Sequence, residues 1–218
     1  MKDKLYQEYG LKINYLIFKK EYICFNDNDN KYMICKTNLS YRDLDELNYI
    51  VNYLDNYAIF FHQLVKGKNG YVFEFSGNKY VLLKIRIVSE RIININEILK
   101  LSSIPFRVEN SNLIEQKIDF LEEYVANYET KFENFDYFIG LAENSILLFN
   151  LHNPSEKRYL NHKRIHFNET AFDFYNPLNI VIDYRTRDLA EYAKSLFIAG
   201  NDKIFEYLKL IKIDDWYT

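Results

Sequence analysis

The stretches that decide the fold are Asn179-Ile-Val-Ile-Asp183 and, shortly after it, Arg187-Asp-Leu-Ala-Glu-Tyr192. The first is a short apolar run that follows a turn at Tyr175-Asn-Pro177, which is typical of a buried strand. The second begins an amphipathic pattern that predicts a helix as far as Ile198. Asp188 lies in the first turn of that helix, where a carboxylate interacts favourably with the helix dipole. The two stretches predict a strand that ends in a carboxylate and leads into a helix.

Helices also predominate between about residue 91 and these stretches. Apolar residues recur at alternating spacings of four and three, which predicts a long amphipathic helix packed on a neighbour. They are Ile114, Ile118, Leu121, Val125, Tyr128 and Phe132. Asp136 is a candidate cap for the next helix, Tyr137 to Phe149, which is apolar on most sides and is therefore expected to be central and buried. Shorter helices are expected from about Asn96 and from an Asp202 cap to about Ile213.

Strands predominate before residue 90. One hairpin is predicted where Tyr22–Phe25 and Tyr32–Cys35 flank the polar turn Asn26–Asn30, and a second over residues 71–87. A further short strand is expected at Ile59–Phe61.

A single helix over residues 41–57 is predicted between the hairpins. Ser40 and Asp43 form a capping-box-like pair at its start, and a buried stripe follows. Strands that precede helices in this segregated order predict an α+β fold rather than an alternating parallel-sheet fold. We expect a β-rich small lobe over residues 1–90 and a helical large lobe over residues 91–218.

Composition and charge exclude several classes of protein. The 218 residues are 48% hydrophobic and carry a net charge of -3, so the basic excess of a nucleic-acid-binding protein is absent. No run of 18 apolar residues or signal-peptide core is present, which predicts a cytoplasmic protein that does not bind membranes. Cys24 and Cys35 lack the spacing of a zinc site, and we expect both to be reduced.

A lysine of the small lobe carries the first part of a resemblance to a known family. Lys36 ends the predicted strand Met33-Ile-Cys-Lys36, after a hairpin and before the 41–57 helix, on which Glu46 lies. In this order the chain resembles the spore-coat-associated, CotS-type kinase-like proteins, which belong with the aminoglycoside and choline phosphotransferases. The resemblance implies a two-lobed, protein-kinase-like fold. It also implies that Lys36 binds the phosphates of ATP while paired with Glu46.

In the large lobe, the most specific match is the R-D-L-A start of the helix at Arg187. The resemblance gives Asp188 a structural role, in which it caps its helix and braces the catalytic loop. It makes Asp183 the magnesium-binding aspartate at the end of a strand.

The resemblance fails at the catalytic loop, His162-Lys163-Arg164. Active members place Asp where this chain has Arg164, and a guanidinium neither accepts a proton at neutral pH nor tolerates a nearby magnesium ion. Five residues on, Glu169 stands where a metal-binding Asn is expected. We interpret His162 as bracing this loop, because no third ligand accompanies His162 and His166.

Three functions fit these residues. The leading hypothesis is a catalytically inactive pseudokinase that serves as a binding or scaffold module without a cofactor, associated with the spore coat if the source forms spores. The second is an active small-molecule phosphotransferase that uses Mg-ATP, with Asp183 and Glu169 as metal ligands and Asp173 as base. The third is an α+β interaction protein with no nucleotide site, supported by the 20 Tyr. The partner is an unidentified protein or small molecule.

Overall fold

The protein divides into two units in the structure, a computed structural model that describes residues 1–19, 21–106, 134–151 and 157–209. Unit 1 comprises Met1–Asn94 and Phe167–Ile180, and unit 2 comprises Ile95–His166 and Val181–Thr218. The return of the chain to unit 1 after residue 166 is a feature that the sequence did not predict. The amphipathic helix predicted over residues 114–132 lies outside the described residues. Within the described ranges, no helix is long and apolar enough to cross a membrane.

An antiparallel sheet forms the centre of unit 1. Its strands are β1 (Ile17–Phe18), β2 (Tyr22–Asp27), β3 (Asn30–Lys36), β4 (Gln63–Leu64), β5 (Val72–Phe75) and β6 (Asn78–Lys84). Their order is β1-β2-β3-β6-β4, with β5 paired to β6. Both predicted hairpins are confirmed, and Gly77 makes the second turn with a left-handed φ of 74° that glycine adopts without strain.

The strand predicted at Ile59–Phe61 is wrong, because the pairing begins only at Gln63. Phe61 instead packs edge-on against Tyr175, with ring centroids 5.4 Å apart. The backbone of His62 bonds to Tyr175 rather than to a strand. Burial of the Ile59 and Phe61 side chains, without strand pairing, therefore explains the apolar run that suggested a strand.

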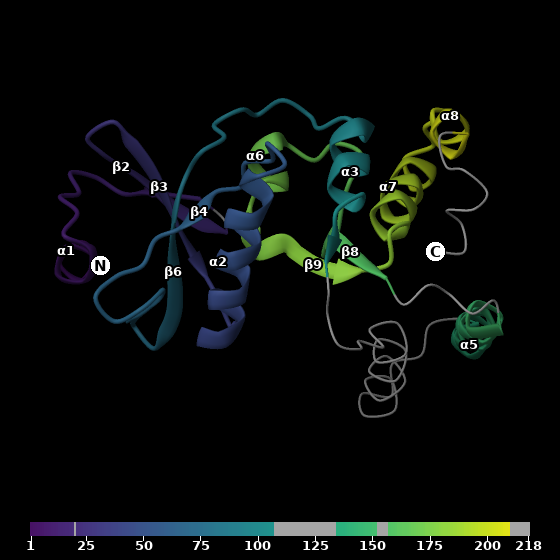
Figure 1. Cartoon of the computed structure of the whole chain (residues 1–218), viewed down its shortest axis with the longest axis horizontal. Coiled ribbons are helices and arrows are strands. Elements are labelled where there is room, and N and C mark those ends of the chain that lie inside the picture. Colours follow the sequence, from purple (N-terminus) through teal and green to yellow (C-terminus); the bar gives the residue numbers. More distant parts are fainter. Residues whose placement is uncertain (20, 107–133, 152–156, 210–218) are drawn as a thin grey trace. The chain divides into compact units, whose positions relative to one another are not determined.

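The strand register separates the two faces of the sheet. Ile23 lies opposite Ile34 and Phe25 opposite Tyr32, whereas Cys24 lies opposite Met33 on the other face. The first face is buried under α1 (Lys2–Tyr9), a helix that the sequence did not predict. Its core consists of Leu5, Phe25, Tyr32, Ile34, Phe73 and Leu82. Figure 1 shows α2 on the opposite side of the strands from α1.

Helix α2 (Tyr41–Asp55) confirms the predicted helix and its capping box. The amide of Ser40 donates to the Asp43 carboxylate at 2.9 Å, and the amide of Asp43 donates to the Ser40 hydroxyl at 3.2 Å. These bonds satisfy amides at the helix start that have no partner within the helix. The apolar stripe that the sequence predicted is buried as a whole.

Residues 167–180 are fastened to unit 1 by backbone hydrogen bonds. They include α6 (Ala171–Phe174) and a 3₁₀ turn, η1 (Pro177–Asn179). Ala171 donates to the carbonyl of Arg91 and Phe172 to that of Ser89. The fully buried His62 adds two bonds, because its amide donates to the Tyr175 carbonyl at 2.9 Å and its Nε2 lies 3.0 Å from the Phe172 carbonyl.

The tautomer of His62 follows from its neighbours. The amide of Arg86 donates to Nδ1, so the proton is on Nε2, which donates to Phe172. The His62 ring is therefore neutral, and it links its own segment to Arg86 and to Phe172.

Unit 2 contains α3 (Ile95–Ser102), β7 (Pro105–Phe106), α5 (Phe135–Leu151), β8 (Arg158–His162), α7 (Arg187–Ile198) and α8 (Ile204–Leu208). It also contains β9 (Ile180–Asp183), apart from the first residue, Ile180, which belongs to unit 1. The strands form a small sheet in the order β7-β8-β9. Helix α3 contacts both β8 and α7, and buries Ile98 and Leu101. The predicted helices near Asn96 and from Arg187 to Ile198 are confirmed.

Two predictions about helices of unit 2 are wrong. Helix α5 is exposed rather than central, since Tyr137 is 65% and Leu147 57% exposed. The prediction failed because an apolar helix is buried only where other elements pack around it. Helix α8 has Lys203, not Asp202, at its N-cap, and no side chain caps it.

The buried ring of His62 predicts a loss of stability in acid. Burial lowers the pKa of His62 from 6.5 to about 4. Between these values the unfolded chain binds a proton more readily than the folded chain, so stability decreases as the pH falls and the loss reaches about 3 kcal/mol. The free energy of unfolding can be measured in urea at pH 7 and at pH 4. From pH 7 to pH 4 it should fall by about 3 kcal/mol less in His62→Gln than in the wild type. The exposed His166 supplies the control, and His166→Gln should behave as the wild type. If the free energy of unfolding depended equally on pH in all three proteins, His62 would not be the cause of the acid loss.

Candidate functional site

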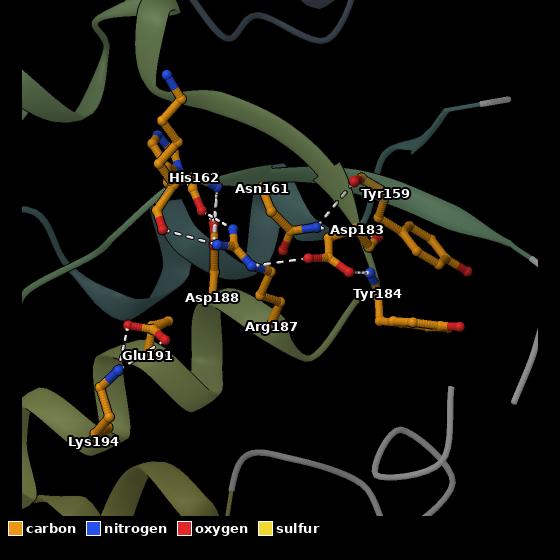
Figure 2. Close-up of polar contacts among 10 residues, drawn as sticks. Tyr159, Asn161, His162, Asp183, Tyr184, Arg187, Asp188, Glu191 and Lys194 are labelled. Atoms are coloured by element: carbon orange, nitrogen blue, oxygen red, sulfur yellow. Dashed lines mark hydrogen bonds and ion pairs between the residues drawn. The ribbon is translucent and has the colours of Figure 1, made fainter. Parts of the chain in front are cut away.

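A buried carboxylate joins the end of β8 to the start of α7 (Figure 2). The Asp188 side chain is fully buried and accepts the amide of His162 at 2.9 and 3.0 Å. The His162 ring nitrogen Nδ1 lies 3.0 Å from the same carboxylate and donates to it, because a carboxylate only accepts. Asp188 makes no cap bond to α7, whose N-cap is Thr186. The Asp188 carboxylate thus fixes both the backbone position and the ring orientation of His162.

The guanidinium of Arg187 binds the same stretch through its carbonyl groups. It donates to the carbonyls of His162 and Lys163, the second at 2.8 Å. Its Nε lies 2.9 Å from Oδ2 of Asp183. The planar fork of Arg is suited to several acceptors at once, so one side chain joins the loop after β8 to the end of β9.

The carboxylate of Asp183 is occupied by groups of this chain. Asp183 is 5% exposed, and while Oδ2 pairs with Arg187, Oδ1 accepts the amide of Tyr184 at 2.8 Å. A magnesium ion needs near-octahedral oxygen ligands and would be repelled by the adjacent guanidinium. The residues at Asp183 therefore do not fit the magnesium ion that the resemblance implies. Across the described ranges, no group of three or more His, Cys, Asp or Glu is arranged to hold a metal ion.

Asn161 completes this cluster beside Asp183. Its amide nitrogen donates to the carbonyls of Tyr159 at 2.9 Å and Asp183 at 3.3 Å, which ties β8 to β9. Its buried amide oxygen has no hydrogen-bond partner among the described residues.

The side chains of the remaining large-lobe candidates are distributed over both units. Lys163, Arg164 and His166 are exposed in unit 2. Glu169 and Asp173 belong to unit 1, whereas Asp183 belongs to unit 2. The binding role of Arg187 was not predicted from the sequence, although its spacing of four residues from Asp183 could have indicated an ion pair. The role of His62, which follows a short apolar run, was not predicted either.

The structure does not bring Lys36 and Glu46 together. Lys36 lies opposite Tyr80 and shares the face of Ile34, which α1 covers, while Glu46 is exposed on α2. No ion pair joins them among the described residues. Since side chains alternate along a strand, the neighbouring Cys35 points to the other face. Burial raises the pKa of the Cys35 thiol to about 12, so the thiol is neutral.

Unit 1 contains a pocket of about 520 Å³, lined by residues of β2 and β3 and by the chain around Phe172. Tyr22 and Phe172 contribute aromatic rings with centroids 5.5 Å apart. Two cations and two acids balance its charge; they are Lys19, Lys31, Glu90 and Asp173. Asp173 accepts a 2.6 Å hydrogen bond from the Thr170 hydroxyl. The pocket is therefore partly aromatic, and the charged side chains among its described lining residues balance one another.

Comparison with solved structures decides the fold. The chain is similar to the aminoglycoside phosphotransferase from Alicyclobacillus acidocaldarius subsp. acidocaldarius DSM 446, with a TM-score of 0.57 and 13% identity over 89% of this chain and 71% of that one. The fold is that of the aminoglycoside phosphotransferases. The AMP-bound spectinomycin phosphotransferase APH(9)-Ia has a TM-score of 0.51 and 14% identity over 87% of this chain and 72% of its own.

A second structure of APH(9)-Ia, in complex with ADP and spectinomycin, has a TM-score of 0.52 and 11% identity over 94% of this chain and 76% of its own. No protein-family model matches the sequence, and no curated protein matches it. The predicted α+β, two-lobed kinase-like fold is confirmed. At these identities the phosphotransferase structures show the fold and not the activity.

Removing the Asp188 carboxylate should strongly destabilise unit 2. Asp188→Ala leaves the buried amide and ring nitrogen of His162 without their hydrogen-bond acceptor, which should lower the free energy of unfolding by about 3 kcal/mol. Urea unfolding followed by circular dichroism measures this change.

Glu191 provides a matched control on the same helix. It pairs with Lys194 at 2.8 Å on the exposed side of α7. Glu191→Ala should change the free energy of unfolding by no more than about 0.5 kcal/mol. Similar losses in the two variants would contradict a bracing role for Asp188.

Proposed function

We propose that this protein is a kinase-like binding module that does not transfer phosphate. The observation that carries the proposal is the 2.9 Å ion pair between Asp183 and Arg187. Phosphoryl transfer on this fold needs metal ions that neutralise the phosphates and a residue that orients the acceptor hydroxyl. The carboxylate in the metal-binding position is instead engaged by a guanidinium of its own chain.

The position of the catalytic base supports the same proposal. Arg164 stands where an aspartate would accept or orient the hydroxyl proton of the acceptor, and its side chain is exposed. A guanidinium remains protonated at every physiological pH and cannot replace that aspartate. The expected metal position therefore holds an aspartate that is already paired with Arg187, and the expected position of the base holds an arginine.

We propose that the ligand is a planar aromatic molecule of about nucleotide size, bound in the pocket of unit 1 without magnesium. The cavity of about 520 Å³ is within the size range of small-molecule sites. The rings of Tyr22 and Phe172 offer stacking surfaces, and the polar side chains around them offer orienting contacts. AMP and ADP, which are bound in the structures of spectinomycin phosphotransferase, are the natural first probes.

An active small-molecule phosphotransferase is the alternative. It is favoured by the Asp173 carboxylate in the pocket wall, which would act as the base. That alternative requires the Asp183 carboxylate to exchange Arg187 for a metal ion. A role in the spore coat is a finer proposal that rests on the sequence resemblance alone.

Ligand binding can be tested by thermal denaturation with AMP, ADP and ATP, each with and without magnesium. We expect a nucleotide to raise the melting temperature and magnesium to add nothing, because binding to the folded state alone stabilises it. Phe172→Leu should weaken the affinity about tenfold by removing one aromatic surface. Phe60→Leu, on an exposed residue of unit 1 outside the pocket, is the control.

Two results would contradict the proposal. A melting temperature that none of the three nucleotides changes would show that the protein does not bind the proposed ligand. Magnesium-dependent phosphate transfer to an aminoglycoside or another acceptor, abolished by Asp183→Asn, would establish the active alternative.

A further inference from the structure

Three tyrosines form a ladder on the exposed side of α2 and the turn that follows it. Tyr49 and Tyr53 are stacked with ring centroids 6.3 Å apart and an interplanar angle of 17°. Tyr53 and Tyr57 are closer, at 5.2 Å, and their rings are tilted by 59°. The hydroxyls of Tyr53 and Tyr57 form a 2.7 Å hydrogen bond. The second pair therefore differs from the first in both distance and orientation.

The second pair has the geometry that links two phenols through their rings. In a tyrosyl radical, unpaired electron density lies on the oxygen and on the ring carbons ortho and para to it, and the para carbon already carries the side chain. Two radicals therefore join through ortho carbons, and the product has adjacent hydroxyls and mutually twisted rings. Tyr53 and Tyr57 already have adjacent hydroxyls and tilted rings, whereas the nearly parallel Tyr49 and Tyr53 rings present their faces to each other.

Solvent access allows an oxidant to reach this pair. Tyr57 is 41% exposed and Tyr53 is half-buried beside it. The hydrogen bond to Tyr57 raises the pKa of Tyr53, so this hydroxyl stays protonated at neutral pH. Each phenol must lose a proton together with its electron, and the exposed Tyr57 hydroxyl offers a direct route to water.

We propose that Tyr53 and Tyr57 are a site of oxidative modification, at which a peroxidase with hydrogen peroxide couples them into an intrachain dityrosine. Each phenol gives up one electron and one proton, and the two radicals form a carbon–carbon bond between ortho carbons. Transfer of the two ortho hydrogens to the oxygens restores both aromatic rings and hydroxyls. The peroxide accepts the two electrons and two protons and becomes two molecules of water.

The bond would fix the C-terminal end of α2. Tyr53 lies in the last turn of the helix, and Tyr57 lies beyond its C-cap, Asn56. The chain then passes through Ala58, which has a left-handed φ of 54°, towards the buried His62. Coupling would close a loop around this turn and resist unwinding of the helix end. This modification is independent of the proposed ligand and of phosphate transfer.

The experiment treats dilute, full-length protein with a haem peroxidase and hydrogen peroxide. Dityrosine fluorescence is measured in the monomer band after denaturing electrophoresis, which separates intrachain from interchain coupling. Trypsin releases residues 43–66 as one peptide that contains all three tyrosines. We expect this peptide to lose the mass of two hydrogens and to give no backbone fragments between Tyr53 and Tyr57.

Tyr57→Phe tests the pair with the loss of a single hydroxyl, since phenylalanine cannot form the radical. It should reduce the monomer fluorescence to background while circular dichroism stays unchanged. Tyr49→Phe, a neighbour on the same ladder, should keep both the fluorescence and the mass change. Undiminished monomer fluorescence in Tyr57→Phe, coupling found only between molecules, or a bond mapped to another pair would overturn the proposal.

Discussion

The first turn of α7 holds two oppositely charged side chains that bind the same piece of chain. Asp188 accepts the amide and ring of His162, and Arg187 donates to the carbonyls of His162 and Lys163. Donors and acceptors at the end of β8 are therefore satisfied by one dipeptide. Buried charges are stable only while they are paired and hydrogen-bonded, so the small sheet and α7 must keep this arrangement together.

The same dipeptide restricts the chemistry of the site. Arg187 extends from the loop after β8 to Asp183, and its charge cancels that of the carboxylate at 2.9 Å. A side chain that braces the loop thus also occupies the group that a metal would need. Arg164 is exposed where the sequence resemblance expects an acid, which supports our proposal that this site does not transfer phosphate. The pocket of unit 1, with its aromatic walls, supports a binding role instead.

Local patterns predicted much of this structure. The Ser40 capping box, the hairpin turns and the R-D-L-A helix start each depend on residues near one another in the sequence. Register was harder to predict, because a shift of one residue along β3 transfers Lys36 from one face of the sheet to the other. The sequence showed that Lys36 ends the strand, but the face it occupies depends on pairing with β6. The role of His62 was equally hidden, since two of its partners, Phe172 and Tyr175, lie more than a hundred residues away in the sequence.

A titration with Mn²⁺, a paramagnetic substitute for magnesium, most directly tests whether the Asp183 carboxylate is closed to metal. Electron paramagnetic resonance reports the free aqueous ion, and the titration is run with ADP present so that a nucleotide-dependent site is also detected. If Arg187 holds Asp183, the protein should not lower the free Mn²⁺ signal below that of a matched solution of ADP without protein. Stoichiometric binding of Mn²⁺ by the wild type, lost in Asp183→Asn, would contradict the account.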